Sequence, residues 1–555
     1  MFASVCQVII FSILRYCAEM EVWMYFCINS FALSGLSVLP VSVEADISDG
    51  LPVMDLVGYL GSEVKEARER VRTALKNSGF TIPVKRITIN VSPASIRKQG
   101  TAFDLPIALS MMVCMELIAP QCLEGCAVMG ELSLNGDIQG INGVLPRVLK
   151  AREMGFKSCF VPLENAAEGG MVDGIDVYGV DSLTGMWAHF SKGAVIAPTK
   201  TDLDEILNDM AREKFEDFAD IRGQPLIKRC MKISAAGLHN VLMIGPPGAG
   251  KTMSASRMAG ILPPLTKDEC LELTKIYSVA GMLPESGMIL KRPVVSPHHT
   301  CTPQALAGGG NIPRPGAISL AHKAVLFLDE LPEFKKEALE ILRQPLEEKK
   351  VHIARANANY TYPADFLLIA AMNPCRCGYY PDMKKCSCTM KDVKNYLSRI
   401  SGPLLDRIDL CIEVGEISYD ELSGEFAPDI LTDGTRSMAE GNEEAIREES
   451  TEDILRDVMA ARERQTFRFR NEGISVNSQM NPSMIMKYCH LGRRENLLLK
   501  EAFKRLNMSA RAYHRTLKVA RTIADLADSE KIDEKHLYEA ISMKIPDKTY
   551  GNMGG

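Results

Sequence analysis

Residues 245–252 carry the strongest chemical signal in the chain, a glycine-rich loop that ends in Lys-Thr and follows the apolar run 241–244. The pattern G-x-x-x-x-G-K-[ST] after a buried strand forms a loop whose backbone N–H groups surround phosphates. The lysine would neutralise the β- and γ-phosphates, and the threonine hydroxyl would hold Mg²⁺. The alternative is an ordinary Gly/Pro turn before a helix. We predict that ATP with Mg²⁺ binds at Gly245, Pro246, Pro247, Gly248, Ala249, Gly250, Lys251 and Thr252.

Two later apolar runs end in polar residues that would complete such a site. Asp329 and Glu330 follow the run 325–328, where Asp329 would hold the Mg²⁺ shell and Glu330 would act as general base toward water. Without a phosphate loop, this pair would instead suggest a helix N-cap. Asn373 ends the next run and would orient water beside the γ-phosphate, unless it is a turn residue before Pro374. Buried strands with polar carboxyl ends indicate a parallel α/β nucleotide domain.

Arginines near the end of this domain and beyond it are candidates for stabilising the transferred phosphate. Arg407, in LLDRIDL, is the candidate arginine finger toward a neighbouring subunit's nucleotide, and Arg399 is its competitor. Either could instead form a surface ion pair. Arg511 is the candidate arginine that closes over the phosphates of its own chain, with Arg515 one turn later as its competitor.

Four cysteines form the pattern C-x-C-x₈-C-x-C. Four thiols within so short a segment match the donor count of a tetrahedral structural Zn²⁺ site, and they leave no open position for catalysis. The alternative is a set of four unliganded thiols in a reducing compartment. We predict structural zinc at Cys375, Cys377, Cys386 and Cys388.

Several long strings in one order, among them SPHHT, PRPGAISLAH, VLFLDELPEF and LSRISGPLLDRIDL, resemble the magnesium-chelatase-like AAA+ ATPases of the YifB/ComM group. The resemblance covers roughly residues 41–548 and implies hexameric rings with ATP between subunits. Members of the ComM type are implicated in DNA branch migration during natural transformation. The resemblance places Ile221 and Gly223 beside the adenine.

The same resemblance implies two insertions, residues 292–316 and a hairpin at 351–363, which would face the central pore. Basic residues there would contact the phosphates of a threaded single-stranded or branched DNA. A solvated basic edge is the alternative. The candidate DNA contacts are His298, His299, Lys349, Lys350, His352 and Arg355.

Residues 130–155 resemble the proteolytic domain of Lon-type proteases, which use a Ser nucleophile and a Lys base. The Ser position falls within 100–104, which contains no Ser, and the Lys position falls near Leu145. Ser110 and Lys150 could in principle substitute for such a dyad. We therefore expect a degenerate domain that serves as a scaffold. Residues 1–40 depart from the family pattern, as a frame error would produce, and leave the first strand in doubt.

The whole chain of 555 residues, with a net charge of −6 and 16 Cys, predicts a multidomain protein of the cytoplasm without a membrane anchor. The expected fold class is α/β. It comprises a Lon-protease-like (S5-type) α+β N-terminal domain, an AAA+ P-loop α/β domain and a C-terminal α-helical lid. The predicted parts are an N-terminal extension (1–40), the Lon-like domain (41–197), a linker (198–216), the ATPase domain (217–415), an acidic linker (416–452) and the lid (453–548).

The motifs predict an ATP hydrolase, and the family resemblance implies that it forms hexameric rings and moves branched or single-stranded DNA. The first alternative is a chelatase-type remodeller that acts on a partner protein. An ATP-dependent protease is disfavoured by the missing dyad, and an ATP-binding switch without hydrolysis is disfavoured by Glu330 and Arg407. Between Arg456 and Arg521 the chain is strongly basic, which indicates either DNA contacts or a lid whose arginines serve nucleotide and subunit contacts.

Overall fold

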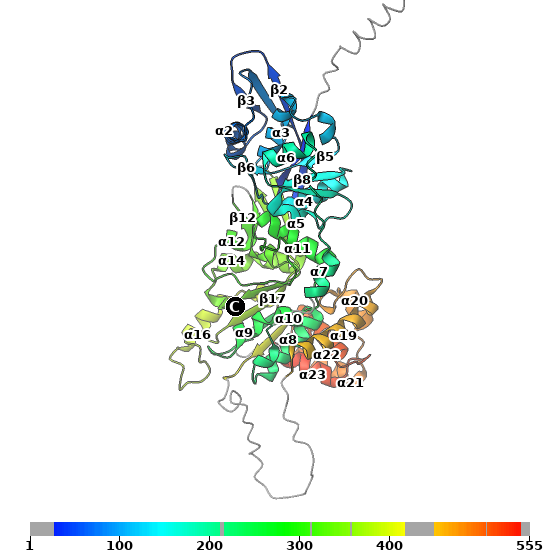
Figure 1. The fold of residues 1–555 in the computed structure, drawn as a ribbon. Coiled ribbons are helices and arrows are strands. Elements are labelled where there is room, and N and C mark those ends of the chain that lie inside the picture. Colours follow the sequence, from blue (N-terminus) through cyan, green and yellow to red (C-terminus); the bar gives the residue numbers. More distant parts are fainter. Residues whose placement is uncertain are drawn as a thin grey trace, which may run out of the picture. The chain divides into compact units, whose positions relative to one another are not determined.

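The computed structural model describes residues 27–210, 216–310, 313–355, 358–416, 449–506 and 508–544. The chain folds as two compact units, which divide between Asp202 and Leu203 (Figure 1). Most of the predicted acidic linker (residues 417–448) and of the predicted N-terminal extension (residues 1–26) lies outside the described residues. Among the described helices, none is long and apolar enough to cross a membrane.

The first unit is built on a seven-stranded mixed sheet in the order β3-β4-β2-β1-β5-β8-β9. Helix α3 packs against β1 and β2, helix α2 packs against α3, and helix α4 lies against β1, β2 and β8. The strands are β1 (Ile28–Ser34), β2 (Ser37–Ser48), β3 (Met54–Val57), β4 (Arg86–Ser92), β5 (Cys126–Val128), β8 (Ser158–Pro162) and β9 (Asp176–Val180), beside the small pair β6 (Glu131–Leu132) and β7 (Ile138–Gln139). The helices are α2 (Ser62–Asn77), α3 (Asp104–Cys114), α4 (Val144–Glu153), α5 (Ala166–Gly169) and α6 (Leu183–Ser191).

The boundary predicted at residue 41 falls inside β2, so this domain begins earlier than the sequence suggested. Strand β1 pairs with β2 along its whole length and also with β5, which makes it a central strand of the sheet. Ile28, Phe31 and Ala32 on this strand are at most 2 % exposed. Their apolar character, which looked foreign to the family pattern, is what a central strand requires.

The second unit contains a five-stranded parallel sheet in the order β11-β14-β17-β10-β18. The strands are β10 (Val241–Ile244), β11 (Val294–Val295), β14 (Val325–Leu328), β17 (Leu367–Met372) and β18 (Leu410–Glu413). Every residue of β10, β14 and β17 is buried, as the continuous apolar runs predict. Because all five strands are parallel, the loops that follow them lie along one edge of the sheet.

Helices connect these strands and surround the sheet. Helix α11 begins at a capping box, in which Thr266 and Glu269 satisfy each other's backbone N–H groups. The helices of this part are α7 (Leu203–Met210), α8 (Pro225–Gly237), α9 (Lys251–Ser256), α10 (Met258–Ile261), α11 (Lys267–Ala280), α14 (Lys336–Ile341), α15 (Arg343–Glu348), α16 (Met390–Leu397) and α17 (Gly402–Leu405). Helix α7 occupies the segment predicted as a linker helix.

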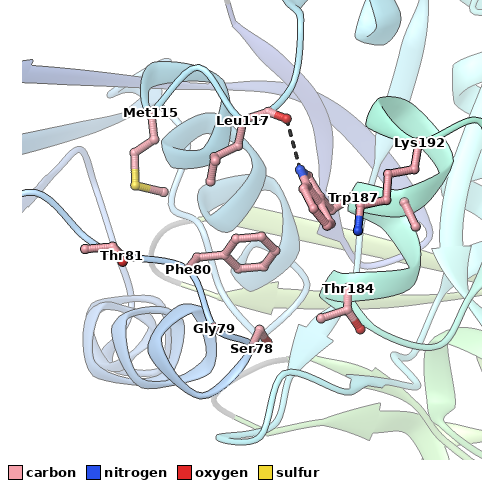
Figure 2. A pocket seen from close by; sticks show the side chains of 10 residues that line it. Ser78, Gly79, Phe80, Thr81, Met115, Leu117, Thr184, Trp187 and Lys192 are labelled. Carbon is pink, nitrogen blue, oxygen red and sulfur yellow. Dashed lines mark hydrogen bonds between the residues drawn. The ribbon is translucent and has the colours of Figure 1, made fainter.

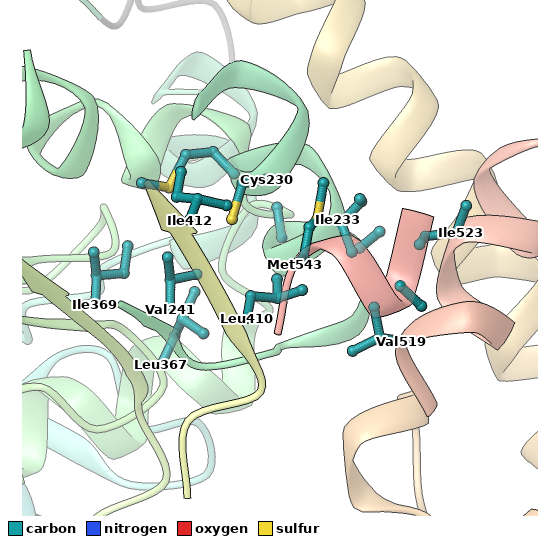
Figure 3. Packing of buried hydrophobic residues seen from close by; sticks show 14 of the residues in the cluster. Cys230, Ile233, Val241, Leu367, Ile369, Leu410, Ile412, Val519, Ile523 and Met543 are labelled. Carbon is teal, nitrogen blue, oxygen red and sulfur yellow. The ribbon is translucent and has the colours of Figure 1, made fainter. Parts of the chain in front are cut away.

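The C-terminal helices share one hydrophobic core with the sheet. Figure 3 shows Cys230 and Ile233 of α8 between side chains of β10 and β18 and side chains of α22 and of Met543, the residue after α23. Burial of this shared apolar surface fixes the helical domain against the sheet of its own chain. The helices are α19 (Thr451–Phe469), α20 (Pro482–Tyr488), α21 (Arg493–Arg505), α22 (Ala510–Leu526) and α23 (Glu534–Ser542).

The two predicted insertions form short hairpins that pack together. The first contains α12 (Pro303–Ala307), β12 (Gly308–Gly309) and β13 (Arg314–Pro315) and is followed by α13 (Ala317–Leu320), and the second contains β15 (Lys350–Arg355) and β16 (Ala358–Pro363). Tyr362 is fully buried, and its hydroxyl donates a hydrogen bond to the Pro313 carbonyl at 2.8 Å. This contact joins β16 to the turn before β13.

Candidate active site

The phosphate loop leaves β10 at the carboxyl edge of the sheet and enters α9. A Cβ on Gly245 would lie 2.5 Å from the Val414 carbonyl oxygen, so no larger residue fits between β10 and the end of β18. Gly248 and Gly250 have φ of +78° and +80°, a left-handed conformation that glycine adopts without strain. The loop therefore has the close packing and the backbone conformation that its glycines predicted.

Lys251 connects the loop to the predicted water-orienting residue. Its Nζ donates hydrogen bonds to the carbonyls of Gly245 (2.6 Å) and Pro246 (2.8 Å) and to Oδ1 of Asn373 (3.3 Å). Burial lowers the pKa of Lys251, and the charge of Asp329 opposes this shift. Phosphate oxygens would compete with these acceptors for the ammonium group, and they would draw it toward the γ-phosphate beside Asn373.

Thr252 and Asp329 form the oxygen pair expected of a Mg²⁺ site. The Thr252 hydroxyl donates a hydrogen bond to Oδ2 of Asp329 at 2.7 Å, although their chain positions are far apart. Oδ1 of Asp329 accepts the backbone N–H of Glu330 at 2.9 Å, which fixes the carboxylate. A hydroxyl and a carboxylate held together in this way fit the hard cation that kinases and ATPases use. Mg²⁺ bound there would neutralise charge on the β- and γ-phosphates.

Glu330 lies next to Asp329 in an unusual backbone conformation. Its φ is +51°, uncommon for a residue other than glycine, and its side chain is 53 % exposed. Oε2 lies 3.3 Å from Nδ1 of His299. The sequence predicted His299 as a DNA contact and gave no signal for this pairing.

The segment predicted to lie beside the adenine is close to the phosphate loop. Ile221 is 3 % exposed, and the nearby Gln224 donates a hydrogen bond from Nε2 to the Gly415 carbonyl at 2.9 Å. Gly415 directly follows Val414, which packs against Gly245. The segment that contains Ile221 and Gly223 therefore lies at the same edge of the sheet as the phosphate loop.

Arg407 lies at the amino edge of the sheet, opposite the edge that carries the phosphate loop. Its carbonyl accepts a hydrogen bond from Nδ2 of Asn240, the residue before β10, at 3.0 Å. Strand β10 has four residues and spans roughly 13 Å, so the backbone of Arg407 is far from the phosphate loop of its own chain. The guanidinium pairs with Glu347 at 2.5 Å. The competitor Arg399 pairs with Glu333 at 2.9 Å.

Arg511 is not placed as an arginine that closes over its own chain's phosphates. Its Nη2 lies 3.7 Å from Oε1 of Glu347, the same oxygen that pairs with Arg407. Its competitor Arg515 donates hydrogen bonds to the carbonyls of Leu405 and Ile408, just before β18. The shared core that holds α22 against the sheet keeps both arginines at the amino edge of the strands. Glu347, which joins Arg407 and Arg511, carried no sequence signal.

The four cysteines come together after β17. Their Sγ atoms all lie within 4.8 Å of one another, and Cys375, Cys377 and Cys386 are separated by 3.3 to 3.7 Å. A tetrahedral zinc site with Zn–S bonds of about 2.3 Å has S–S edges of about 3.8 Å. The backbone N–H of Tyr380 also points to the Cys375 sulfur at 3.4 Å. This donor set fits a closed structural zinc site.

The cysteine loop is also in contact with the nucleotide site. A Cβ on Gly378 would lie 2.7 Å from Cδ of Pro247, so the loop packs closely on the phosphate loop there. Asn373 is two residues before Cys375. The fold of the cysteine loop therefore affects the position of both Pro247 and Asn373.

The candidate DNA contacts do not form one set. Lys350, His352 and Arg355 are exposed on β15, and a Cβ on Gly309 of the other hairpin would lie 3.1 Å from the Arg355 guanidinium. Lys349 instead pairs with Asp365 at 3.2 Å. His298 and His299 lie in the loop after β11, where His299 faces Glu330.

The positions where a Lon-type protease has its Ser and Lys contain other residues in this chain. Leu145 is fully buried, and the Thr101 hydroxyl donates its hydrogen bond to the Glu131 carboxylate. Ser110 donates to the Ile107 carbonyl at 2.8 Å, while Lys150 pairs with Glu153 at 2.9 Å on the next helix. Neither Ser110 nor Thr101 is paired with a lysine, so the described residues show no Ser–Lys dyad at the positions expected for one.

A cavity of about 540 Å³ in the first unit was not signalled by any motif. Figure 2 shows Phe80 and Trp187 on its wall, with the Trp187 indole donating a hydrogen bond to the Leu117 carbonyl at 3.1 Å. The Lys192 ammonium lies 4.4 Å from the centre of the Trp187 ring. Its lining also includes Ser78, Thr81 and Thr184.

Comparisons with known proteins match most of the chain. Residues 217–422 match the family model described as magnesium chelatase, subunit ChlI; residues 43–165 match subunit ChlI of Mg-chelatase, and residues 448–544 match the ChlI C-terminal model. The chain is 39% identical over 522 residues to the protein YifB of Salmonella typhimurium, across 94% of this chain and 97% of YifB. It is 37% identical over 518 residues to competence protein ComM of Haemophilus influenzae, across 93% and 97% of the two chains. A shorter match of 161 residues, 27% identical, is to a Lon protease of Mycolicibacterium smegmatis, across 27% of this chain and 20% of the protease.

Proposed function

The chain belongs to the YifB/ComM family of magnesium-chelatase-like AAA+ ATPases, and from this premise we propose that it forms a ring that uses ATP hydrolysis to move DNA in branch migration. The nucleotide site supports the ATPase part of the proposal. One observation favours DNA as the substrate: the two insertion hairpins pack together and expose basic residues.

The proposed reaction is in-line attack of water on the γ-phosphorus of ATP. Glu330 accepts the water proton as the new P–O bond forms, and the bond between the γ-phosphorus and the bridging oxygen breaks to release ADP. Lys251 neutralises the charge that develops on the β- and γ-phosphates, and Asn373 orients the water. Arg407 of the neighbouring subunit contacts the γ-phosphate across the subunit boundary. It cannot reach the phosphate loop of its own chain, because the two lie at opposite edges of the sheet. Arg511, which shares Glu347 with Arg407, is assigned to the same subunit boundary.

DNA would bind to the joined hairpins through its backbone phosphates. Lys350 and His352 alternate on β15 with the buried Val351 and Ile353, so the basic side chains share the exposed face. Arg314 is exposed on β13 of the partner hairpin. A patch of this kind contacts phosphates without reading the base sequence.

Replacing Lys350 and Arg355 together with Glu should weaken binding of single-stranded DNA at least roughly ten-fold at moderate salt, because two phosphate contacts are lost and two repulsions are added. Fluorescence anisotropy with labelled DNA over a salt series measures this, and the slope of log K against log salt should become shallower. Lys65 and Arg72, which are exposed on α2 of the first unit, supply the charge-matched control when both are replaced with Glu. Equal DNA affinity in the wild type, the hairpin variant and the control variant would show that the hairpins do not bind DNA.

The cysteine cluster is proposed to hold zinc and to support the phosphate loop. Changing Cys386 and Cys388 to Ser should remove the metal, lower the thermal midpoint and raise the KM for ATP, since Gly378 packs on Pro247. Elemental analysis, thermal denaturation and ATPase titrations measure the three effects. Cys122, an exposed thiol in the first unit, gives the control variant Cys122→Ser. Fresh wild-type protein without zinc would contradict the assignment.

A chelatase-type remodeller of a partner protein is the second candidate, because the matched family models describe magnesium chelatase subunits. It predicts an ATPase rate that is indifferent to DNA and is raised by a protein partner. A protease function has no support from the described residues of the first unit, since they contain no Ser–Lys pair at the positions expected for one.

A further inference from the structure

A cavity of about 750 Å³ lies at the amino edge of the parallel sheet, the edge opposite the phosphate loop. Ala324, directly before β14, and Leu367, the first residue of β17, line it together with side chains of helix α19. Cavities that bind small molecules enclose roughly 300 to 1,000 Å³. None of the residues assigned above to the nucleotide, zinc or DNA lines this cavity, so it is a separate space of a size suited to a ligand.

Arg462 of α19 brings a positive charge without a counter-ion to this cavity. Its Nε and Nη2 both donate hydrogen bonds to one acceptor, the Ala235 carbonyl in the last turn of α8, at 3.1 and 2.7 Å. Among the described residues, Nη1 has no hydrogen-bond partner and the guanidinium forms no salt bridge. Burial lowers the pKa of Arg462 to about 9, and the charge of Arg292 adds to this shift, whereas Glu269 opposes it. An anion in the cavity would stabilise the charge that burial disfavours.

The other cations that line the cavity differ from Arg462 because each has a carboxylate partner. A neutralised cation attracts a further anion only weakly, so Arg462 is the group that would select the ligand charge. The acidic lining residue Glu463 is exposed to solvent, where its charge is screened. The pairs are Arg292 with Glu269 (2.7 Å), Lys323 with Asp365 (2.9 Å) and Arg456 with Asp453 (2.9 Å).

Much of the remaining lining is apolar. Leu262 and Phe366 are each 5 % exposed, and Pro263 and Pro264 continue the same surface. Met459 of α19 also lines the cavity. A ligand that fills this space would place an apolar or aromatic body against these side chains, because burial of such surface is favourable.

We propose that this cavity binds a small organic anion, a carboxylate or a phosphate monoester with an apolar or aromatic body, whose charged group is held by Arg462. A guanidinium presents the same N–H donors to carboxylate and to phosphate oxygens. The bound anion would connect α19 to the amino ends of β14 and β17, because both supply the lining. This binding is independent of what the ring moves.

The test uses the full-length protein saturated with ADP and Mg²⁺, so that the phosphate loop is already filled. The probes are para-fluorophenyl phosphate, para-fluorobenzoate and the neutral para-fluorobenzyl alcohol, each titrated by fluorine NMR. Arg462→Gln removes the charge, and Ala460→Trp fills the cavity from α19 while leaving the arginine in place. Arg505→Gln changes an exposed arginine of α21 outside the cavity and serves as the control.

Wild type should bind at least one of the two anions roughly ten-fold or more tightly than the alcohol, because a charge-assisted hydrogen bond is made only by the anion. Arg462→Gln should remove most of that difference, Ala460→Trp should weaken binding of all three probes, and Arg505→Gln should match wild type. The anion that binds more tightly identifies carboxylate or phosphate as the ligand group.

Equal affinity of wild type for the anions and the alcohol, or no binding of either anion, would overturn the inference. So would an anion affinity that is unchanged in both Arg462→Gln and Ala460→Trp. If Arg462→Gln does not fold, because α8 loses the contact at its last turn, Ala460→Trp decides alone. Loss of anion binding in that variant supports the site, and unchanged binding contradicts it.

Discussion

Replacing Glu330 with Gln should reduce ATP hydrolysis by a factor of about 10² to 10⁴ while ATP binding and ring assembly persist. Gln keeps the size of the side chain but cannot accept the proton of the attacking water. The side chains proposed to hold the phosphates and Mg²⁺, Lys251, Thr252 and Asp329, have their own contacts. Single-turnover hydrolysis and nucleotide-binding titrations measure the two steps independently.

The matched control for this experiment is Glu333→Gln, which changes a nearby carboxylate that pairs with Arg399 instead of facing the nucleotide. It should retain most of the wild-type rate. A Glu330→Gln protein that no longer binds ATP would show that Glu330 holds the nucleotide and is not the base. Retention of the full hydrolysis rate would assign the base to another residue.

Replacing Arg407 with Ala should lower kcat by a factor of about 10³ or more, the range measured for arginine fingers, without loss of ATP binding by the same chain. The physical reason is position, since Arg407 lies at the edge of the sheet opposite its own phosphate loop. Arg399→Ala, which removes a pair with Glu333 and a hydrogen bond to the Pro332 carbonyl, should have a small effect. ATPase assays on assembled rings measure both variants.

Mixed rings test the direction of this arginine. Subunits with Arg407→Ala still have an intact phosphate loop, and subunits with Lys251→Ala still have an intact Arg407. When the two are mixed, some boundaries contain both working halves, so activity should exceed that of either variant alone. Mixtures with no gain would mean that Arg407 acts within its own chain or only supports the fold, through its pair with Glu347.

The nucleotide site was predictable because each part is written in a short local pattern. The sequence contains a glycine-rich loop that ends in Lys251-Thr252 and an acidic pair that follows a buried strand. These two patterns predict both the chemistry of the site and the strands that position it. The parallel sheet then brings the ends of β10, β14 and β17 to one edge, as the contacts between Thr252 and Asp329 and between Lys251 and Asn373 confirm. Local sequence patterns of this kind can be recognised without knowing how the helices and strands pack.

Features set by tertiary packing could not be predicted in the same way. The placement of Arg511 depends on how α22 docks in the core shared with α8 and β18, and no local pattern records that docking. Glu347 and His299 acquire their partners only through the order of strands and helices in space. The central strand β1 was left in doubt because residues 1–40 depart from the family pattern, and its partners β2 and β5 become evident only in the folded sheet.

The most direct test of a DNA motor is the migration of a synthetic four-way junction by assembled wild-type rings with ATP and Mg²⁺, followed by gel separation of the labelled products. The account predicts that junctions are converted to duplex products only with hydrolysable ATP, that single-stranded or junction DNA raises the ATPase rate, and that Glu330→Gln rings bind the junction without converting it. Assembled rings that hydrolyse ATP at one rate with or without DNA, and leave the junction intact, would contradict it.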